Sequence, residues 1–354
     1  MTDIRWTLPE PLAPAPAEPT GRQLPAVVTA RSPLRVSLAG GGTDLPSYSS
    51  RYGGLVISCA INRYVGVTVF PREFRGRARV VVEGYSEHDH TDQHPNPMTR
   101  ACLLRAGLHS GYQLTAFSDV PSGCGLGGSG AFAVSVLHAG SGGARPPART
   151  LAESAAEVEI SDLGRPVGKQ DHYMAAYGGI RLLRFHPSGS VDPDPLVLAP
   201  AFRAELESQL LLFHTGTSRD AGSILADQNK RTLQGHSDAL RRLHAIRSLA
   251  DEMTGALESR DMGAVAGLIN EHWSLKARLS ARVSSPRLQA LHDTALEAGA
   301  AGAKLLGSGG GGFLLLVCPR NRQSEVRRAM DEQGLPELSF RFTDSGSRSG
   351  RLPL

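Results

Sequence analysis

The chain has 354 residues, of which 40% are hydrophobic and 20% charged, and its formal net charge is +4. This length suits two domains, and the composition is typical of a globular protein. The mild and unclustered excess of basic residues argues against a nucleic-acid partner but suits small anionic ligands. No apolar run approaches the roughly 20 residues that span a bilayer, so we expect no membrane partner.

Residues 1–24 are rich in proline and lack the basic and apolar regions of a signal peptide, so we expect a disordered lead-in. The four cysteines are scattered singly and match neither a zinc site nor a disulfide framework. A reducing, cytoplasmic location fits this cysteine usage best.

The first third of the chain predicts a sheet. Residues 26–38 alternate and are rich in β-branched side chains, which predicts one or two strands. They lead into the loop 39–46, where three consecutive glycines let the backbone approach a ligand and Asp44 supplies a hydrogen-bond acceptor. The alternative is an ordinary hairpin turn. Residues 54–70 and 77–84 predict further strands, so we expect an antiparallel sheet.

The stretch 119–131 contains five glycines within eight residues, between a predicted strand at 112–117 and a predicted helix at 132–137. A glycine-rich turn before a helix leaves backbone N–H groups free, and the helix dipole adds partial positive charge there. The loop is therefore a candidate phosphate-binding site. The alternative is a tight turn without a ligand, which glycines also mark.

Helices are predicted at 97–109 and 151–163, and the second of them carries Glu159. Lys169 and Asp171 stand at a further predicted helix start. The helix dipole favours a carboxylate at such a position, and a nearby cation would keep it ionised. The alternative is a helix cap beside a solvated lysine.

The second half of the chain alternates apolar strands with long helical stretches. Its predicted elements are, in chain order, a strand at 180–186, a proline-rich linker at 187–200, a strand at 209–214, helices up to 258 and at 261–279 and 286–298, a glycine loop leading into a strand that ends at 318, a helix at 323–332 and a strand at 337–342. This order lacks βαβ regularity, which predicts an α+β fold.

Glycine loops of this kind hold phosphates and sugars. The lysine of a Walker A loop is absent, however, and so are the protein-kinase motifs. The loops at 33–44, 121–131 and 304–313 resemble, in type and order, the three motifs of the GHMP small-molecule kinases. The resemblance covers roughly residues 27–345.

Within that family, 34–48, 163–171 and 270–276 are most similar to the branch that phosphorylates the anomeric hydroxyl of D-glycero-D-manno-heptose 7-phosphate to give the 1,7-bisphosphate. The resemblance implies a two-domain α+β GHMP kinase fold. The first domain would be like a domain of a small-subunit ribosomal protein, and the second would be ferredoxin-like with extra helices. The expected domains are 25–190, which would bind nucleotide and substrate, and 191–354.

The resemblance also implies ATP or GTP and Mg²⁺ as cofactors, and a role for each motif. Asp171 would take the proton of the anomeric hydroxyl, while Arg35 and Lys169 would neutralise charge on the transferring phosphoryl group or keep Asp171 ionised. Ser129 and Glu159 would be magnesium ligands. The nucleotide loop would comprise Pro121, Ser122, Gly123, Gly125, Leu126, Gly127, Gly128, Ser129 and Gly130. Substrate contacts would come from Gly41, Gly42, Thr43, Asp44, Gly309, Gly310, Gly311 and Arg219.

Two departures from the family pattern bear on affinity and substrate. Gly128 stands where a second loop hydroxyl is usual, and His172 stands where glutamine is common. The alternatives are an anomeric kinase for another sugar, such as a hexose or a fucose-like sugar, and a non-catalytic regulator that binds nucleotide or sugar. A 7-phosphate site needs cationic groups, for which Arg219 and Lys304 are candidates. A homodimer is compatible with the sequence.

Overall fold

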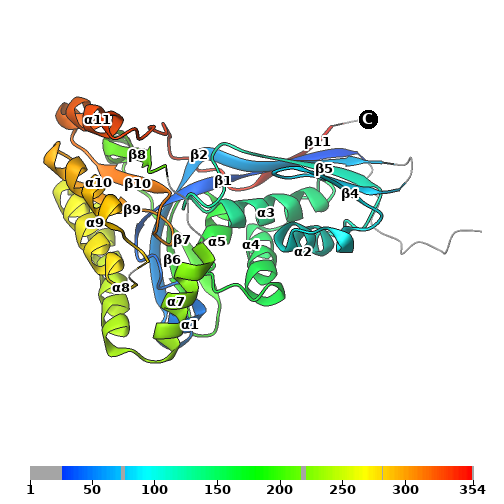
Figure 1. The fold of residues 1–354 in the computed structure, drawn as a ribbon, viewed down its shortest axis with the longest axis horizontal. Coiled ribbons are helices and arrows are strands. Elements are labelled where there is room, and N and C mark those ends of the chain that lie inside the picture. Colours follow the sequence, from blue (N-terminus) through cyan, green and yellow to red (C-terminus); the bar gives the residue numbers. More distant parts are fainter. Residues whose placement is uncertain (1–25, 73–75, 217–220, 281, 353–354) are drawn as a thin grey trace, which may run out of the picture.

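Two lobes that lie side by side make up the structure (Figure 1). The computed structural model describes residues 26–72, 76–216, 221–280 and 282–352, so the predicted lead-in at 1–24 lies outside them. One lobe carries long strands covered on one face by helices, and the other packs helices around a short sheet. Within these ranges, every helix is too short or too polar to cross a bilayer.

An eight-stranded sheet, as far as the described residues go, forms the first lobe. Its strands are β1 (Val27–Ala39), β2 (Gly54–Pro71), β3 (Ala78–Val81), β4 (Tyr85–His88), β5 (Tyr112–Ser118), β6 (Ile180–Phe185), β7 (Val191–Pro195) and β11 (Arg348–Leu352). The main path is β11-β1-β2-β5-β3-β4, and the long strand β2 also pairs with β6, which pairs with β7. β3 runs parallel to β5, whereas β2 is antiparallel to β1, β5 and β6.

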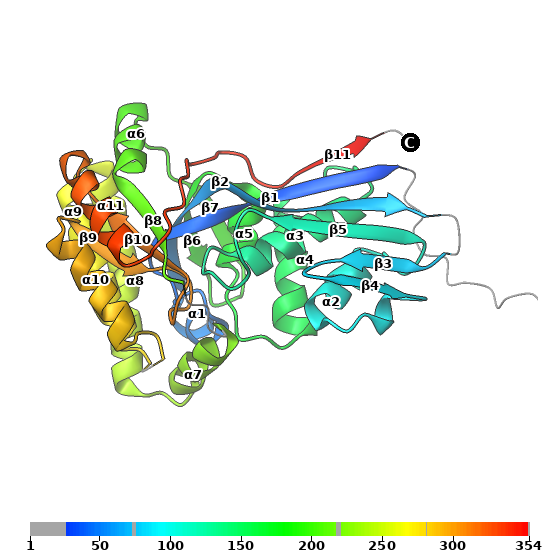
Figure 2. The same cartoon turned by 45° about the horizontal axis from the view of Figure 1, so that its top comes forward.

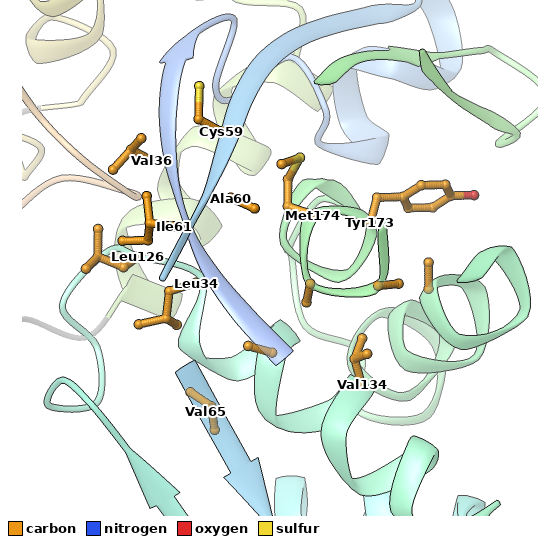
Figure 3. Packing of buried hydrophobic residues seen from close by; sticks show 14 of the residues in the cluster. Leu34, Val36, Cys59, Ala60, Ile61, Val65, Leu126, Val134, Tyr173 and Met174 are labelled. Atoms are coloured by element: carbon orange, nitrogen blue, oxygen red, sulfur yellow. The ribbon is translucent and has the colours of Figure 1, made fainter. Parts of the chain in front are cut away.

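Helices cover one face of this sheet (Figure 1). The helical segments on this face are η1 (Thr91–Gln93), α2 (Pro97–Arg105), α3 (Gly128–Gly140), α4 (Ala148–Glu157), the π-helical turn η2 (Val158–Asp162) and α5 (Gln170–Tyr177). The short helix α1 (Pro46–Tyr52), between β1 and β2, packs instead against helices of the second lobe. α3 is apolar and buried almost throughout, as expected for a helix enclosed by a sheet and other helices. Figure 3 shows the resulting core, where Val65 on β2, Val134 on α3 and Met174 on α5 are buried in one cluster.

The second lobe packs helices around a sheet of β8 (Leu210–His214), β9 (Gly302–Leu305) and β10 (Phe313–Val317), with β10 in the centre. Its helical segments are α6 (Pro200–Gln209), α7 (Ala221–Leu233), α8 (Ser237–Glu258), α9 (Met262–Ala277), α10 (Pro286–Glu297), η3 (Arg320–Arg322) and α11 (Gln323–Glu332). The Asp261 side chain caps α9 by accepting a hydrogen bond from the Ala264 N–H at 2.9 Å. The α+β prediction is confirmed.

Two segments differ from their predicted structure. The proline-rich stretch 187–200, expected as a linker, contains β7, which is antiparallel to β6. Prolines are tolerated there because β7 is an edge strand, with N–H positions that need no partner. The stretch 337–342, expected as a strand, makes only isolated bridges, from Glu337 to Phe213 and from Phe342 to Ile61.

Two segments in the second half of the chain, one near residue 190 and one near the C-terminus, add strands to the sheet of the first lobe. β7 extends that sheet beyond residue 190, and β11 pairs with β1 near the end of the chain. Figure 2 shows β11 alongside β1. The expected boundary between 190 and 191 therefore falls inside the β6–β7 hairpin. We propose instead that the first domain comprises 26–195 and 343–352, and the second 196–342.

Candidate active site

A cavity of about 460 Å³ lies between the two lobes, and all three glycine loops line it. One loop follows β1, one precedes α3, and one joins β9 to β10. A second hollow of about 500 Å³ lies between α8 and α9, but it is open to solvent and is lined by none of the glycine loops. The cavity between the lobes is therefore the candidate active site.

Two of the glycine loops touch through their backbones. Gly125 has a φ of 84°, and a Cβ atom there would lie 2.8 Å from the carbonyl oxygen of Leu306. A Cβ atom on Gly312 would overlap the carbonyl of Cys124. Side chains at these positions would push the lobes apart, so the glycines permit a contact between backbones as well as an approach to a ligand.

The N-terminus of α3 opens into the cavity. Gly127, with a φ of 81°, turns the chain into the helix, and Gly128 and Ser129 line the cavity. The free N–H groups of this first turn and the helix dipole favour an anion there. A Cβ atom on Gly128 would meet nothing within 4 Å, so space does not explain the missing hydroxyl at that position.

Asp171, in the first turn of α5, forms an ion pair with Arg35 on β1. The Arg35 Nε donates to Asp171 Oδ1 at 2.8 Å, and a terminal guanidinium nitrogen lies 2.6 Å from the same oxygen. The other terminal nitrogen donates to the Gly125 carbonyl at 2.6 Å. The Arg35 side chain is 6% exposed and that of Asp171 is 28% exposed. The carboxylate is thus reachable from the cavity, with a buried guanidinium behind it.

Glu159 lies in the π-helical turn after α4 and is 1% exposed. Its Oε1 lies 3.2 Å from Nε2 of His172, and its Oε2 accepts from Arg165 at 3.2 Å. The nearby Ser129 side chain also helps to lower the pKa of Glu159. Burial raises the pKa of Glu159, but the hydrogen bond and charge of His172, with the charge of Arg165, outweigh burial and lower the pKa overall. An ionised carboxylate beside a hydroxyl is the kind of oxygen set that Mg²⁺ prefers, so these residues fit the metal.

Asp44 lies in the loop that follows β1, is buried, and lines the cavity. Its Oδ1 accepts a hydrogen bond from the Gly42 N–H at 3.0 Å. Burial and the negative charge of Asp171 raise the pKa of Asp44. Thr43 differs from the prediction, because its hydroxyl donates to the Gly40 carbonyl at 2.8 Å and is fully buried. It therefore holds the loop together and does not line the cavity.

Lys169 is placed elsewhere than expected. Its ammonium donates to Glu153 at 2.6 Å and to the Gly189 carbonyl at 2.8 Å, and it does not line the cavity. The ion pair with Glu153 directs this lysine away from Asp171, so the structure does not support a catalytic role for it. Arg35 provides the cation beside Asp171 instead.

The structure brings most of the other predicted residues together. The cavity wall includes Arg35, Gly41, Gly42, Asp44, Pro121, Gly123, Gly125, Gly127, Gly128, Ser129, Glu159, Asp171, Gly309 and Gly311. It does not include Thr43, Ser122, Leu126, Gly130, Lys169 or Gly310. Leu126 is in the hydrophobic core, and Gly130 lies beneath Asp171, where a Cβ atom would come within 2.8 Å of the aspartate Cβ. Arg219 falls outside the described residues.

Ser37, His272 and Lys276 are among the cavity residues to which the sequence analysis gives no role. Lys304, named above as a candidate cation, also lines it. The chain has four lysines, and two of them are buried here. Lys276 stands in the stretch 270–276 that carries the resemblance, and a lysine is unusual in a chain that uses arginine almost everywhere, so these two features together are the signal that could have identified it.

Comparisons with known proteins agree with this architecture. The model of the GHMP kinases N-terminal domain matches residues 96–179, and that of the GHMP kinases C-terminal region matches residues 253–335. A D-glycero-alpha-D-manno-heptose 7-phosphate kinase of Campylobacter jejuni is 30% identical over 92% of this chain and 99% of its own length.

An L-fucokinase/L-fucose-1-P guanylyltransferase of Bacteroides fragilis is 27% identical over 90% of this chain but only 37% of its own length. Among solved structures, a D-glycero-D-manno-heptose 1-phosphate kinase from Bacteriodes thetaiotaomicron matches with a TM-score of 0.76 at 26% identity, over 92% of this chain and 99% of that one. With its glycine loops and both matching domains, the chain belongs to the GHMP kinase family and is a phosphotransferase.

Proposed function

We propose that this kinase transfers the γ-phosphoryl group of ATP (or GTP) to the anomeric hydroxyl of D-glycero-D-manno-heptose 7-phosphate, giving the 1,7-bisphosphate. The observation that carries the proposal is the Asp171–Arg35 ion pair on the cavity wall, close to the N-terminus of α3. The similarity to the Campylobacter jejuni kinase over 92% of the chain supports the choice of sugar.

The nucleotide phosphates would lie over the loop that precedes α3, where backbone N–H groups and the helix dipole stabilise negative charge. Ser129 and Glu159 would hold Mg²⁺, which neutralises phosphate charge when it is bound. His172 and Arg165 would orient the Glu159 carboxylate through their hydrogen bonds. Phosphoryl transfer depends mainly on positioning and charge neutralisation, so this set of groups is sufficient.

Asp171 would accept the proton of the anomeric hydroxyl as that oxygen attacks the γ-phosphorus. The new O–P bond forms while the bond from the γ-phosphorus to the oxygen of the departing nucleoside diphosphate breaks. Arg35 keeps Asp171 in position, because its guanidinium is itself fixed by the Gly125 carbonyl. Asp44, with the loop glycines Gly41 and Gly42, would hydrogen-bond sugar hydroxyls.

The proposed reaction is tested by incubating the enzyme with Mg²⁺-ATP and a panel of sugars and sugar phosphates, with detection of products by ³¹P NMR. We expect a glycosyl phosphate signal from D-glycero-D-manno-heptose 7-phosphate. If that sugar gives no product while another sugar does, the proposed substrate is wrong. Binding of nucleotide without transfer to any sugar would favour a regulator over an enzyme.

Replacing the proposed base gives a test of mechanism. Asp171→Asn keeps the size of the side chain but cannot accept the proton, so kcat should fall by about 100- to 10,000-fold. Nucleotide affinity, measured by calorimetry, should stay close to that of the wild type. Asp251→Asn, at an exposed position on α8, is the matched control and should retain full activity. Full activity in Asp171→Asn would show that another group takes the proton.

An L-fucose-like sugar is the second candidate substrate, favoured by the similarity to the L-fucokinase of Bacteroides fragilis over 90% of this chain. Competition separates the two candidates. If the heptose phosphate is the substrate, L-fucose should not compete with it at similar concentrations. If L-fucose is phosphorylated with the higher kcat/KM, the second candidate replaces the first.

A further inference from the structure

Three buried nitrogen-bearing side chains meet on the second-lobe side of the cavity. His272 and Lys276 are four residues apart on α9, hence on the same helix face, and Lys304 lies on β9. Their exposed fractions are 1%, 6% and 1%. All three line the cavity, and so does Ser37 on β1. None of them has a part in the proposed transfer step.

The hydrogen-bonding capacity of this group is largely unused. Lys304 donates to the Leu38 carbonyl at 3.0 Å, and Lys276 donates to the Gly307 carbonyl. An ammonium group has three donors, so each lysine has two left. Both ring nitrogens of His272 and the Ser37 hydroxyl are buried without a hydrogen-bond partner among the described residues. The cluster thus presents several buried polar groups that lack a partner.

The charge of the cluster is also unbalanced. In the described part of the chain, neither Lys276 nor Lys304 forms an ion pair with a carboxylate, and Asp44 and Asp171 act on Lys276 only at longer range. Burial and the charge of Lys276 hold the pKa of Lys304 well below its usual range. Burying unpaired cations is costly, and an anion with several acceptor oxygens would offset that cost.

The position of the cluster indicates which anion it would take. Lys276 Nζ lies 3.9 Å from where a Cβ atom of Gly41 would be, on the side of the predicted sugar loop. Ser37 and Arg35 are two residues apart on β1 and so point to the same face, roughly 7 Å apart along the strand. One small molecule would therefore reach both places, with a hydroxyl at the Asp171–Arg35 pair and an anionic group at the cluster.

We propose that His272, Lys276 and Lys304, together with Ser37, bind the phosphate group of a sugar phosphate that does not take part in the transfer. This inference rests on the proposed sugar kinase function and makes its substrate class more specific. The site selects sugars that already carry a phosphate at the end distant from the reacting hydroxyl. Selection arises because an unphosphorylated sugar would leave the buried donors without acceptors.

The first test measures anion binding without turnover. Orthophosphate is titrated into the protein while the ¹H–¹⁵N signals of the His272 ring are followed. We expect saturable shifts in the wild type and their loss in Lys276→Met and Lys304→Met. Methionine is similar in length to lysine and removes the cost of burying an unpaired charge, so the variants should fold. Lys230→Met, at an exposed position on α7, is the matched control and should respond like the wild type.

The second test compares KM values for D-glycero-D-manno-heptose 7-phosphate and for the unphosphorylated heptose. Each lysine variant should raise KM for the sugar phosphate by about tenfold to a hundredfold, while KM for the free sugar and for ATP changes little. If KM for both sugars rises equally, or if only kcat falls, the cluster does not bind the distal phosphate. If wild-type enzyme turns over no sugar but still binds orthophosphate at His272, the proposed function fails and the anion site stands.

Discussion

At the scale of single residues, the charge that Lys276 brings to the cavity depends on pH. In the ligand-free protein, burial and the charge of Arg35 lower the pKa of Lys276 to about 8. The folded-state pKa lies below the usual value, so the ammonium is lost as pH rises through 8. A neutral amine cannot balance the charge of a phosphate group.

We therefore expect kcat/KM for the heptose phosphate to fall by about tenfold per pH unit above pH 8. The measurement is a pH profile at saturating ATP, with the unphosphorylated heptose as the control substrate. In Lys276→Arg, whose guanidinium stays protonated, the fall should move to higher pH. Parallel profiles for the two sugars would contradict this assignment, since titration of a shared catalytic group affects both sugars.

Lys276 and Lys169 show which features of the site the sequence does not predict. The family resemblance implies one site for Arg35, Glu159 and Asp171, which all lie on the wall of the cavity. It also placed Lys169 there, because two residues of separation imply proximity to Asp171. The direction of a side chain depends on its partners, and Glu153 draws Lys169 away. Lys276 ends the stretch 270–276 that carries the resemblance, but the packing of α9 against β9, which brings it to the cavity, cannot be read from local spacing.

At the scale of elements, the sequence predicts a helix or strand correctly where the apolar residues within that element recur with a clear period. The predicted helix at 323–332 agrees with α11, and the predicted strand at 112–117 agrees with β5 to within one residue. The sequence is less informative about which strands pair with each other. β7 looks like a linker because prolines interrupt it, and 337–342 looks like a strand but has no continuous neighbour. Strand pairing is a tertiary property, so the sequence pattern alone does not decide it.

The close crossing of α3 and α5 gives a prediction about activity. A methyl group on Gly130 would lie 2.8 Å from the Cβ of Asp171 and 3.0 Å from the backbone nitrogen of His172, so α5 must shift. Gly130→Ala should therefore lower kcat by roughly a hundredfold, the effect of about 1 Å of misplacement at a reacting group. Steady-state kinetics and thermal unfolding of the variant check this.

The control is Gly255→Ala, a helical glycine on α8 where a Cβ atom would meet nothing within 4 Å. It should keep wild-type activity and gain stability, because alanine favours a helix over glycine by about 1 kcal/mol. Gly130→Ala makes the same change in helix propensity. Loss of kcat in that variant alone is then due to displacement of Asp171, whereas unchanged kcat would show that the crossing adjusts at no cost to the site.

At the scale of the whole molecule, the active site depends on a chain that leaves the first lobe and returns to it. Ser129, Asp171 and Glu159 come from the first lobe, and Lys276, Lys304 and Gly309 come from the second. The backbone contact between Gly125 and Leu306 brings the two sets together. The return is made by β11, which pairs with β1 from Arg31–Arg348 to Val27–Leu352.

Because β11 pairs with β1 but does not line the cavity, removing β11 should lower stability without removing activity. Ending the chain at Ser345 removes β11 and the Ser347 hydroxyl, which bonds to Ser32 at 3.0 Å and to His138 at 2.8 Å. The side chains of β11 are mostly exposed, so the loss is chiefly of hydrogen bonds, at about 1 kcal/mol each. We expect Tm to fall by roughly 5 °C or more, and amide exchange in the outer half of β1 to speed up.

Activity at 25 °C should persist in the truncated protein, because β11 contributes nothing to the cavity wall. Ser347→Ala, which keeps the strand and removes only the two side-chain hydrogen bonds, should lower Tm by less than the truncation. The comparison distinguishes the contribution of the strand from that of the serine. If truncation leaves Tm and β1 exchange unchanged, the pairing adds no stability; if kcat falls in step with Tm, the first sheet transmits the loss from its edge to Arg35 on the same strand, β1.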